Sequence, residues 1–332
     1  MTKKNVIALV GTAAVLVGAA VLVNNGAKPK APKLAGKAIL PAFSVADVAR
    51  IEIGDKLALA AGAEGWTIES LYGYPADREK ITENVLKLGE LKVGQVARGR
   101  TIANPTTLTL KDAAGKELAA LPMGEQHFRK ATGQAAMYGG GSYPDGCYVT
   151  FEGETVLVKD ALEAFDGDPK KWCSTRIAAI PSANVAAVSF AHAGETVELE
   201  KGTNGVWSVK GLGPKEELDT SKTYSLDSAL SYLDFASVVD PKLTEAELGF
   251  ATGYVYTVTL KDGTNHVATV GNKVKDGSDR YFKLDDGKWI YTISSYAAES
   301  MMKTRKDLVK AKEEPKPETD AKPEAGADGK QD

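Results

Sequence analysis

Side chains that commonly perform catalysis or bind metals are scarce in this chain. Its 332 residues include three histidines and two cysteines. The histidines His127, His192 and His266 lie far apart, and no His-Glu-x-x-His or Cys-x-x-Cys motif brings metal ligands together. The chain also lacks a Gly-x-Ser-x-Gly nucleophile elbow and a Gly-x-x-x-x-Gly-Lys-Ser/Thr phosphate loop. We therefore predict no catalytic residues, no metal site, no cofactor and no enzymatic activity.

Reactive and aromatic side chains gather most closely in residues 124–146. This stretch contains His127 and Arg129, and then Tyr138 and Tyr143 on either side of three consecutive glycines. Aromatic rings beside flexible glycines provide stacking surface and reach, which is typical of a loop that contacts peptide or glycan. This irregular stretch is therefore a candidate interaction loop. The interpretation that we favour is a hairpin loop that a disulfide holds in place.

The two cysteines, Cys147 and Cys173, are 26 positions apart in an otherwise cysteine-free chain. A single pair is what one disulfide in an oxidising compartment requires. The alternative is two unconnected buried thiols, because free cysteine is among the most buried residue types. We expect the disulfide if the folded part of the chain is exported.

The elements that position these residues follow an apolar N-terminal run. Residues 5–23 carry no charge and, at about 1.5 Å per residue, span about 28 Å as a helix, close to the thickness of a bilayer core. We predict a signal anchor or transmembrane helix at residues 1–25; a cleaved signal peptide is the alternative. More lysines follow the run than precede it, and by the positive-inside rule this favours a cytoplasmic location for the folded body of the chain. A short tail before an apolar run is nevertheless typical of exported proteins, so we expect the body on the periplasmic side.

The remaining composition is that of a two-domain globular protein. Apolar residues make up 43% and charged residues 26% of the chain. With 41 basic and 44 acidic residues, the net charge of −3 provides no overall basic field, and we expect no nucleic-acid partner. Residues 26–40 are rich in proline, alanine and lysine and predict a linker. Residues 309–332 have too few apolar side chains to form a core and predict a disordered tail.

Between the linker and the tail, the sequence resembles itself. Residues 48–53 and 185–190 are alternating apolar runs that open two similar series of short strands, each ending on a tryptophan. These tryptophans, Trp66 and Trp207, are 141 positions apart, which indicates a duplicated domain rather than a solenoid with repeats of about 20 to 50 residues. We expect both rings to lie in the core.

After each tryptophan strand the apolar period changes from two to about 3.6 residues. Asp77 is a predicted N-cap, and the helix that follows it would bury Ile81, Val85, Leu88 and Leu91. In the second copy a helix beginning at Asp219, Thr220 or Ser221 would bury Leu226, Leu230 and Leu233. The predicted fold is therefore α+β: two tandem homologous domains of antiparallel β-sheet, residues 41–178 and 179–308, each packed by one main helix and preceded by the transmembrane helix.

This order of elements resembles the domain-of-unknown-function 4340 (DUF4340) family. The resemblance rests on the opening strand pair, the Glu-Gly-Trp at residues 64–66, the helix that begins at an aspartate and the Leu-Lys-Asp-Gly hairpin at residues 260–263. It covers about residues 45–305, in two copies. It implies a bacterial membrane-anchored envelope protein with an accessory role beside an ABC-type transporter, and it supplies no catalytic residues.

We therefore expect a single-pass protein of the bacterial cytoplasmic membrane that acts as an extracytoplasmic accessory or scaffold protein. Its partners would be the membrane, through the N-terminal helix, and the permease or ATPase chains of an ABC-type transport complex. One alternative is an envelope enzyme that acts on glycan or peptide through residues 124–146. Another is a ligand-binding module that uses a cleft between the two copies.

Overall fold

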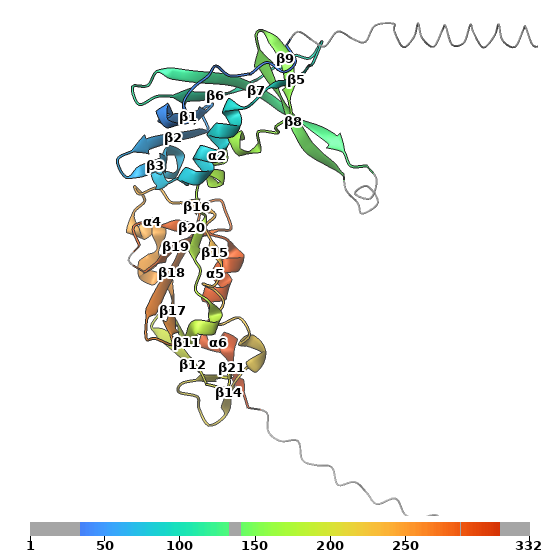
Figure 1. Cartoon of the computed structure of the whole chain (residues 1–332). Coiled ribbons are helices and arrows are strands. Elements are labelled where there is room, and N and C mark those ends of the chain that lie inside the picture. Colours follow the sequence, from blue (N-terminus) through green and yellow to red (C-terminus); the bar gives the residue numbers. More distant parts are fainter. Residues whose placement is uncertain (1–33, 133–140, 286, 313–332) are drawn as a thin grey trace, which may run out of the picture. The chain divides into compact units, whose positions relative to one another are not determined.

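The computed structural model describes residues 34–132, 141–285 and 287–312 (Figure 1). The chain divides into two compact units, with the boundary between Ser174 and Thr175. Antiparallel sheets with few helices make up both units, which confirms the α+β class in this coarser form. The predicted anchor at residues 1–25 lies outside the described residues. Within the described ranges, no helix combines the length and the apolar character needed to cross a membrane.

A nine-stranded antiparallel sheet forms unit 1. Its strands are β1 (Arg50–Ile53), β2 (Leu57–Gly62), β3 (Gly65–Ile68), β4 (Tyr74–Pro75), β5 (Val93–Val96), β6 (Thr106–Lys111), β7 (Glu117–Lys130), β8 (Ser142–Phe151) and β9 (Glu154–Val158). The order across the sheet is β4-β3-β2-β1-β6-β7-β8-β9-β5. Alternating apolar positions place one face of the strands in the core, as in the buried–exposed pattern of β1 and β2.

Helix α2 (Arg78–Gly89) covers the buried side of this sheet, as the sequence predicted. The Asp77 carboxylate is the N-cap and accepts hydrogen bonds from two backbone N–H groups of the first turn. The Asp77 N–H in turn donates to the carbonyl of Trp172 at 2.7 Å, so the start of the helix is tied to the end of the unit. The short 3-10 helices of unit 1 are η1 (Val45–Asp47), η2 (Glu69–Leu71), η3 (Glu163–Phe165) and η4 (Pro169–Trp172).

An eight-stranded antiparallel sheet forms unit 2. Its strands are β11 (Val185–His192), β12 (Glu195–Lys201), β13 (Trp207–Val209), β16 (Ser237–Val238), β17 (Tyr254–Leu260), β18 (Asn265–Lys273), β19 (Arg280–Leu284) and β20 (Tyr291–Ile293). Two small sheets pair β10 (Arg176–Ala178) with β15 (Leu233–Asp234), and β14 (Glu216–Leu218) with β21 (Val309–Ala311). The helices are η5 (Ser182–Asn184), η6 (Thr220–Lys222), α4 (Glu245–Leu248), η7 (Phe250–Thr252), α5 (Ser295–Met301) and α6 (Arg305–Leu308).

The strands of the two main sheets follow the same order. In unit 2 the order is β13-β12-β11-β17-β18-β19-β20-β16. In both units the first three strands of the main sheet, in chain order, lie on one side of it. Four later consecutive strands form the other side, β6 to β9 in unit 1 and β17 to β20 in unit 2. The strand that comes just before those four in the sequence, β5 or β16, lies at the far edge. Unit 1 differs by the additional two-residue strand β4.

Unit 2 lacks the second helix that the leucine spacing predicts. Residues 220–222 form η6, and residues 224–231 form successive turns rather than an α-helix. The reason is local. The hydroxyls of Ser228 and Ser231 donate to the backbone carbonyls three residues before them, and the backbone N–H groups of the same serines donate to the same carbonyls. These bonds compete with the i to i−4 bonds of an α-helix.

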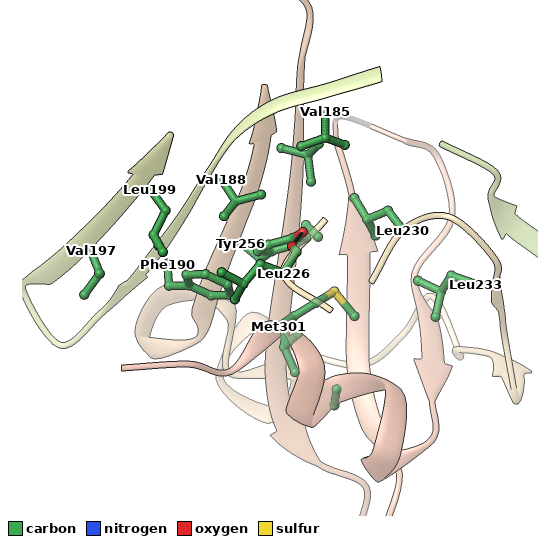
Figure 2. Close-up of a cluster of buried hydrophobic side chains, with 14 of the residues drawn as sticks. Val185, Val188, Phe190, Val197, Leu199, Leu226, Leu230, Leu233, Tyr256 and Met301 are labelled. Carbon is green, nitrogen blue, oxygen red and sulfur yellow. Dashed lines mark hydrogen bonds between the residues drawn. The ribbon is translucent and has the colours of Figure 1, made fainter. Parts of the chain in front are cut away.

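The predicted leucines are nevertheless buried, and α5 packs beside them. Figure 2 shows Leu226, Leu230 and Leu233 around Tyr256 and Met301. The Tyr256 hydroxyl donates to the backbone carbonyl of Leu226, and burial raises the pKa of Tyr256. Five of the core side chains drawn in the same view come from the opening strands: Val185, Val188, Phe190, Val197 and Leu199.

Three further expectations need correction. Ile39 and Leu40, assigned to the linker, are buried in unit 1, because a short apolar pair after the proline-rich stretch can join the core. Residues 309–311, assigned to the tail, form β21 and pair with β14. Trp207 is buried as expected, but Trp66 is only half-buried, since β3 has only the two-residue strand β4 beyond it.

Replacing Leu226 with alanine should lower the free energy of unfolding by about 2–5 kcal/mol, because the side chain is 1% exposed and its loss leaves a cavity. The matched control is Leu212→Ala at a site 38% exposed, where we expect a change within about 0.5 kcal/mol. Urea unfolding followed by circular dichroism measures both. Equal effects would show that residues 223–233 do not cover the core.

A candidate interaction site on a hairpin arm

The central hairpin of unit 1 extends beyond its neighbouring strands. Strand β6 pairs with β7 only as far as Met123, and β9 pairs with β8 only from Cys147 onward. Beyond these points, residues 127–130 and 142–146 pair with each other. We call these two segments the arm, and Figure 1 shows it in green, reaching past the rest of the unit 1 sheet.

The arm corrects the prediction that residues 124–146 form an irregular loop. Gly124–Lys130 belongs to β7 and Ser142–Gly146 to β8. Neither segment shows alternating hydrophobicity, because a two-stranded ribbon without a core beneath it has no face to bury. The expectation of a hairpin is therefore confirmed for the described residues, whereas the disulfide expected to hold it is not formed, because Cys147 and Cys173 are free. Residues 133–140, which include Tyr138, lie outside them.

A β-bulge places one acidic residue between two basic groups. His127 pairs with Gly146 and Phe128 with Pro144, so Asp145 is the extra residue of β8. One carboxylate oxygen of Asp145 contacts His127 Nδ1 at 2.5 Å, and the other contacts Arg129 Nε at 2.7 Å. His127 and Arg129 are two positions apart and share a face of β7, which lets one carboxylate contact both.

This contact changes the acidity of Asp145. The hydrogen bond with His127, followed by the positive charge of Arg129, lowers the pKa of the Asp145 carboxyl below its ordinary value. The carboxylate therefore remains ionised at neutral pH and fixes the directions of the imidazole and the guanidinium group. Side chains held in this way lose little rotamer freedom when a partner binds.

Aromatic and cationic contacts continue this network at the base of the arm. The His127 ring meets the Tyr148 ring edge-on, with centroids 5.8 Å apart. The guanidinium group of Arg100 lies over the same Tyr148 ring, 3.9 Å from its centroid, and also pairs with Glu125. A cavity of about 340 Å³ lies beside Arg100, with Ile102 and Tyr148 in its lining.

The arm exposes one large aromatic side chain on each face. Phe128 is 53% exposed and Tyr143 is 49% exposed. Tyr143 pairs with Arg129 and therefore shares its face, whereas Phe128 pairs with Pro144 on the opposite face. Exposed aromatic residues beside fixed charges are typical of protein interaction surfaces.

The structure brings together three of the four predicted loop residues. His127, Arg129 and Tyr143 share one face of the arm, and Tyr138 lies outside the described residues. Sequence reasoning missed the roles of Asp145 and Phe128. A single register shift creates the Asp145 contact, and no local pattern reports that shift. The exposure of Phe128 could have been anticipated from its basic neighbours, Arg129 and Lys130.

Cys147 and Cys173 do not form the predicted disulfide in the structure. Both are free and buried. The Cys147 thiol contacts the backbone carbonyls of Gly124 and Tyr148, whereas the Cys173 thiol contacts the carbonyls at the start of η4. The alternative of two unconnected buried thiols therefore describes the structure.

Metal ligands do not gather in the described parts of the chain. Within residues 34–132, 141–285 and 287–312, no group of three or more His, Cys, Asp or Glu side chains could hold a metal ion. Of the three histidines, His192 stacks on Tyr254 and His266 contacts Asp285, both within unit 2, whereas His127 belongs to unit 1. The arm itself offers exposed aromatic rings and paired charged groups for binding.

Comparison with known proteins gives one family. A family described as "Domain of unknown function (DUF4340)" matches residues 66–250 and 240–320. The first segment extends across the boundary between the two units. No curated protein and no solved structure matches the chain.

The two thiols generate a prediction about reactivity. Burial raises the pKa of Cys147 and of Cys173 to about 11, so both are neutral thiols at pH 8 and thiolate is the reactive form. We expect the native protein to react with a thiol reagent about 100-fold more slowly than the denatured protein, which should release two thiols without reductant. If the denatured, unreduced protein has no reactive thiols, the result would contradict the structure and would support a disulfide between Cys147 and Cys173.

Proposed function

This chain belongs to the DUF4340 family, and we propose that it is a membrane-anchored accessory or scaffold protein whose unit 1 arm docks a partner protein. The partner class is a permease or ATPase chain of an ABC-type transport complex in the bacterial envelope. The observation that carries the proposal is the arm itself, a two-stranded extension with exposed aromatic residues and a fixed group of charges. The family description names no activity.

The sequence supports the anchoring part of the proposal. Residues 5–23 are long and apolar enough to cross a bilayer once, and Lys3 and Lys4 precede them. A single-pass anchor of this kind places the folded units beside integral membrane proteins, with the body on the periplasmic side. The resemblance to membrane-anchored envelope proteins supports the same location.

The geometry of the arm supports docking by contact with protein. Both edges of the arm lie beyond the last residues paired with β6 and β9, so the backbone of each strand can pair with an added strand. Phe128 and Tyr143 would supply buried anchors, one on each face. Asp145 holds His127 and Arg129 in place, which adds direction to the contact.

We also propose that the two units arose by duplication of one domain. The shared strand order and the similar opening strands at residues 48–53 and 185–190 support this proposal. The arm is specific to unit 1, since the corresponding strands of unit 2, β18 (Asn265–Lys273) and β19 (Arg280–Leu284), are shorter than β7 and β8. Duplication would have left one copy as a structural base and let the other acquire a docking element.

A second candidate function has one observation in its favour. The contact between His127 and Asp145 resembles the orienting half of a general-base dyad, which an envelope enzyme acting on glycan or peptide could use. In that case His127→Ala would abolish an activity without changing the melting temperature, whereas a docking arm depends most on its exposed aromatic anchors.

The double substitution Phe128→Ala and Tyr143→Ala should reduce recovery of membrane partners by about tenfold or more, because each aromatic anchor contributes on the order of 1–2 kcal/mol. The measurement is quantitative affinity purification of the full chain from detergent extracts of its native membranes. Leu86→Ala in α2 is the matched control, since Leu86 is 51% exposed and lies off the arm.

Wild-type protein should recover permease or ATPase chains, and the Leu86→Ala variant should recover them equally well. Recovery of the wild-type chain as a free monomer would overturn the docking proposal. Partner recovery that the double substitution leaves unchanged would show that the arm is not the docking surface.

A further inference from the structure

Unit 2 contains a groove that the proposed function does not use. A cavity of about 440 Å³ lies between the turns of residues 224–233 and helix α5 with the residues that follow it. Each wall places apolar side chains in the core and turns its other side chains toward the groove. Leu226 and Leu230 point into the core from one wall, and Ala298 and Met301 from the other. The outward side chains of both walls line the groove: Tyr224, Ser225, Ser228, Tyr232, Tyr296, Glu299, Ser300 and Lys303.

Three tyrosines dominate the rim of this groove. Tyr224 is 88%, Tyr232 is 74% and Tyr296 is 86% exposed. Large apolar side chains that gather at one groove, with polar residues around them, form the kind of surface patch that marks an interaction site. Exposed tyrosines around a groove are typical of surfaces that recognise proline-rich segments, whose rings pack between aromatic side chains.

One of the tyrosines is fixed in place. The guanidinium group of Arg176 lies over the Tyr232 ring. Asp234 holds that guanidinium group, with Arg176 Nε 2.9 Å from the carboxylate, and the two residues are cross-strand partners in β10 and β15. The rim is therefore partly pre-organised, which lowers the entropy cost of binding a ligand.

The C-terminal residues of the same chain have the required chemistry. Residues 313–332 contain the sequence Lys-Pro-Glu twice, at residues 316–318 and 322–324. Prolines favour the extended polyproline II conformation, and the flanking lysine and glutamate carry opposite charges. The groove offers the complementary charges, Glu299 on α5 and Lys303 just after the end of that helix.

Covalent connection brings this segment close to the groove. Lys303 lines the groove and the described chain ends at Lys312, so the start of the C-terminal segment lies within about 30 Å of the groove. Residues 313–332 can extend about 60 Å in polyproline II form. The segment can therefore reach the groove of its own unit, and the connection gives it a high effective concentration there.

We propose that the tyrosine-lined groove of unit 2 binds a Lys-Pro-Glu sequence from residues 313–332 of the same chain. The proline packs between Tyr224 and Tyr296, the lysine pairs with Glu299 and the glutamate pairs with Lys303. This inference does not depend on the arm.

The test is limited proteolysis of the full chain with glutamyl endopeptidase, which cleaves after Glu318 and Glu324. Cleavage tracks the unbound population, so the double substitution Tyr224→Ala and Tyr296→Ala should raise the cleavage rate by about fivefold or more. The variant Pro317→Ala with Pro323→Ala should raise it similarly and cannot disturb the folding of unit 2. Rates are normalised to synthetic peptides with the corresponding tail sequences. Leu212→Ala removes an exposed apolar side chain of unit 2 outside the groove and should leave the rate unchanged.

Three results would overturn the inference. The first is a wild-type tail that is cleaved as fast as its free peptide. The second is a cleavage rate that the proline substitutions do not change. The third is protection that disappears on dilution, which would assign the bound tail to a second copy of the chain.

Discussion

Each unit depends on covering one face of a single antiparallel sheet. A sheet with alternating apolar positions is stable only when its apolar face lies against another layer. In unit 1, α2 provides that layer, and Asp77 ties its first turn to the segment that ends the unit. In unit 2, the turns of residues 224–233 and helix α5 provide it together. The same strand order therefore tolerates different covering layers, provided that leucine-sized side chains reach the sheet.

The arm and the groove, the two surfaces that we connect with function, are formed by residues that do not have to cover the apolar face of a sheet. The arm continues β7 and β8 beyond the covered sheet, so its side chains are free to be polar or aromatic on both faces. The groove of unit 2 lies on the outer side of its covering layer, where Tyr224, Ser228 and Tyr232 are exposed beside the core leucines. In both places the buried residues set the course of the backbone, and the exposed side chains are available to bind a partner.

Local sequence signals predicted the elements that local physics determines. The Asp77 cap, the buried face of α2 and most strands follow from capping and periodicity. The helix expected after Asp219 fails because serine hydroxyls compete for backbone carbonyls, although its leucines are buried as expected. The candidate site was harder to predict, since the contact of Asp145 with His127 and Arg129 depends on a bulge in the pairing of two strands. Hairpin register is set by the paired strands together.

The central claim is that the arm contacts a partner protein in the membrane, and site-specific photocrosslinking tests it most directly. A benzophenone side chain in place of Phe128 would report contacts of the arm in intact cells. The same probe in place of Leu86 would report an equally exposed position on α2. We predict a discrete crosslinked product at position 128 that contains a transport permease or ATPase chain, and none at position 86. No product at position 128, or the same products at both positions, would contradict the account.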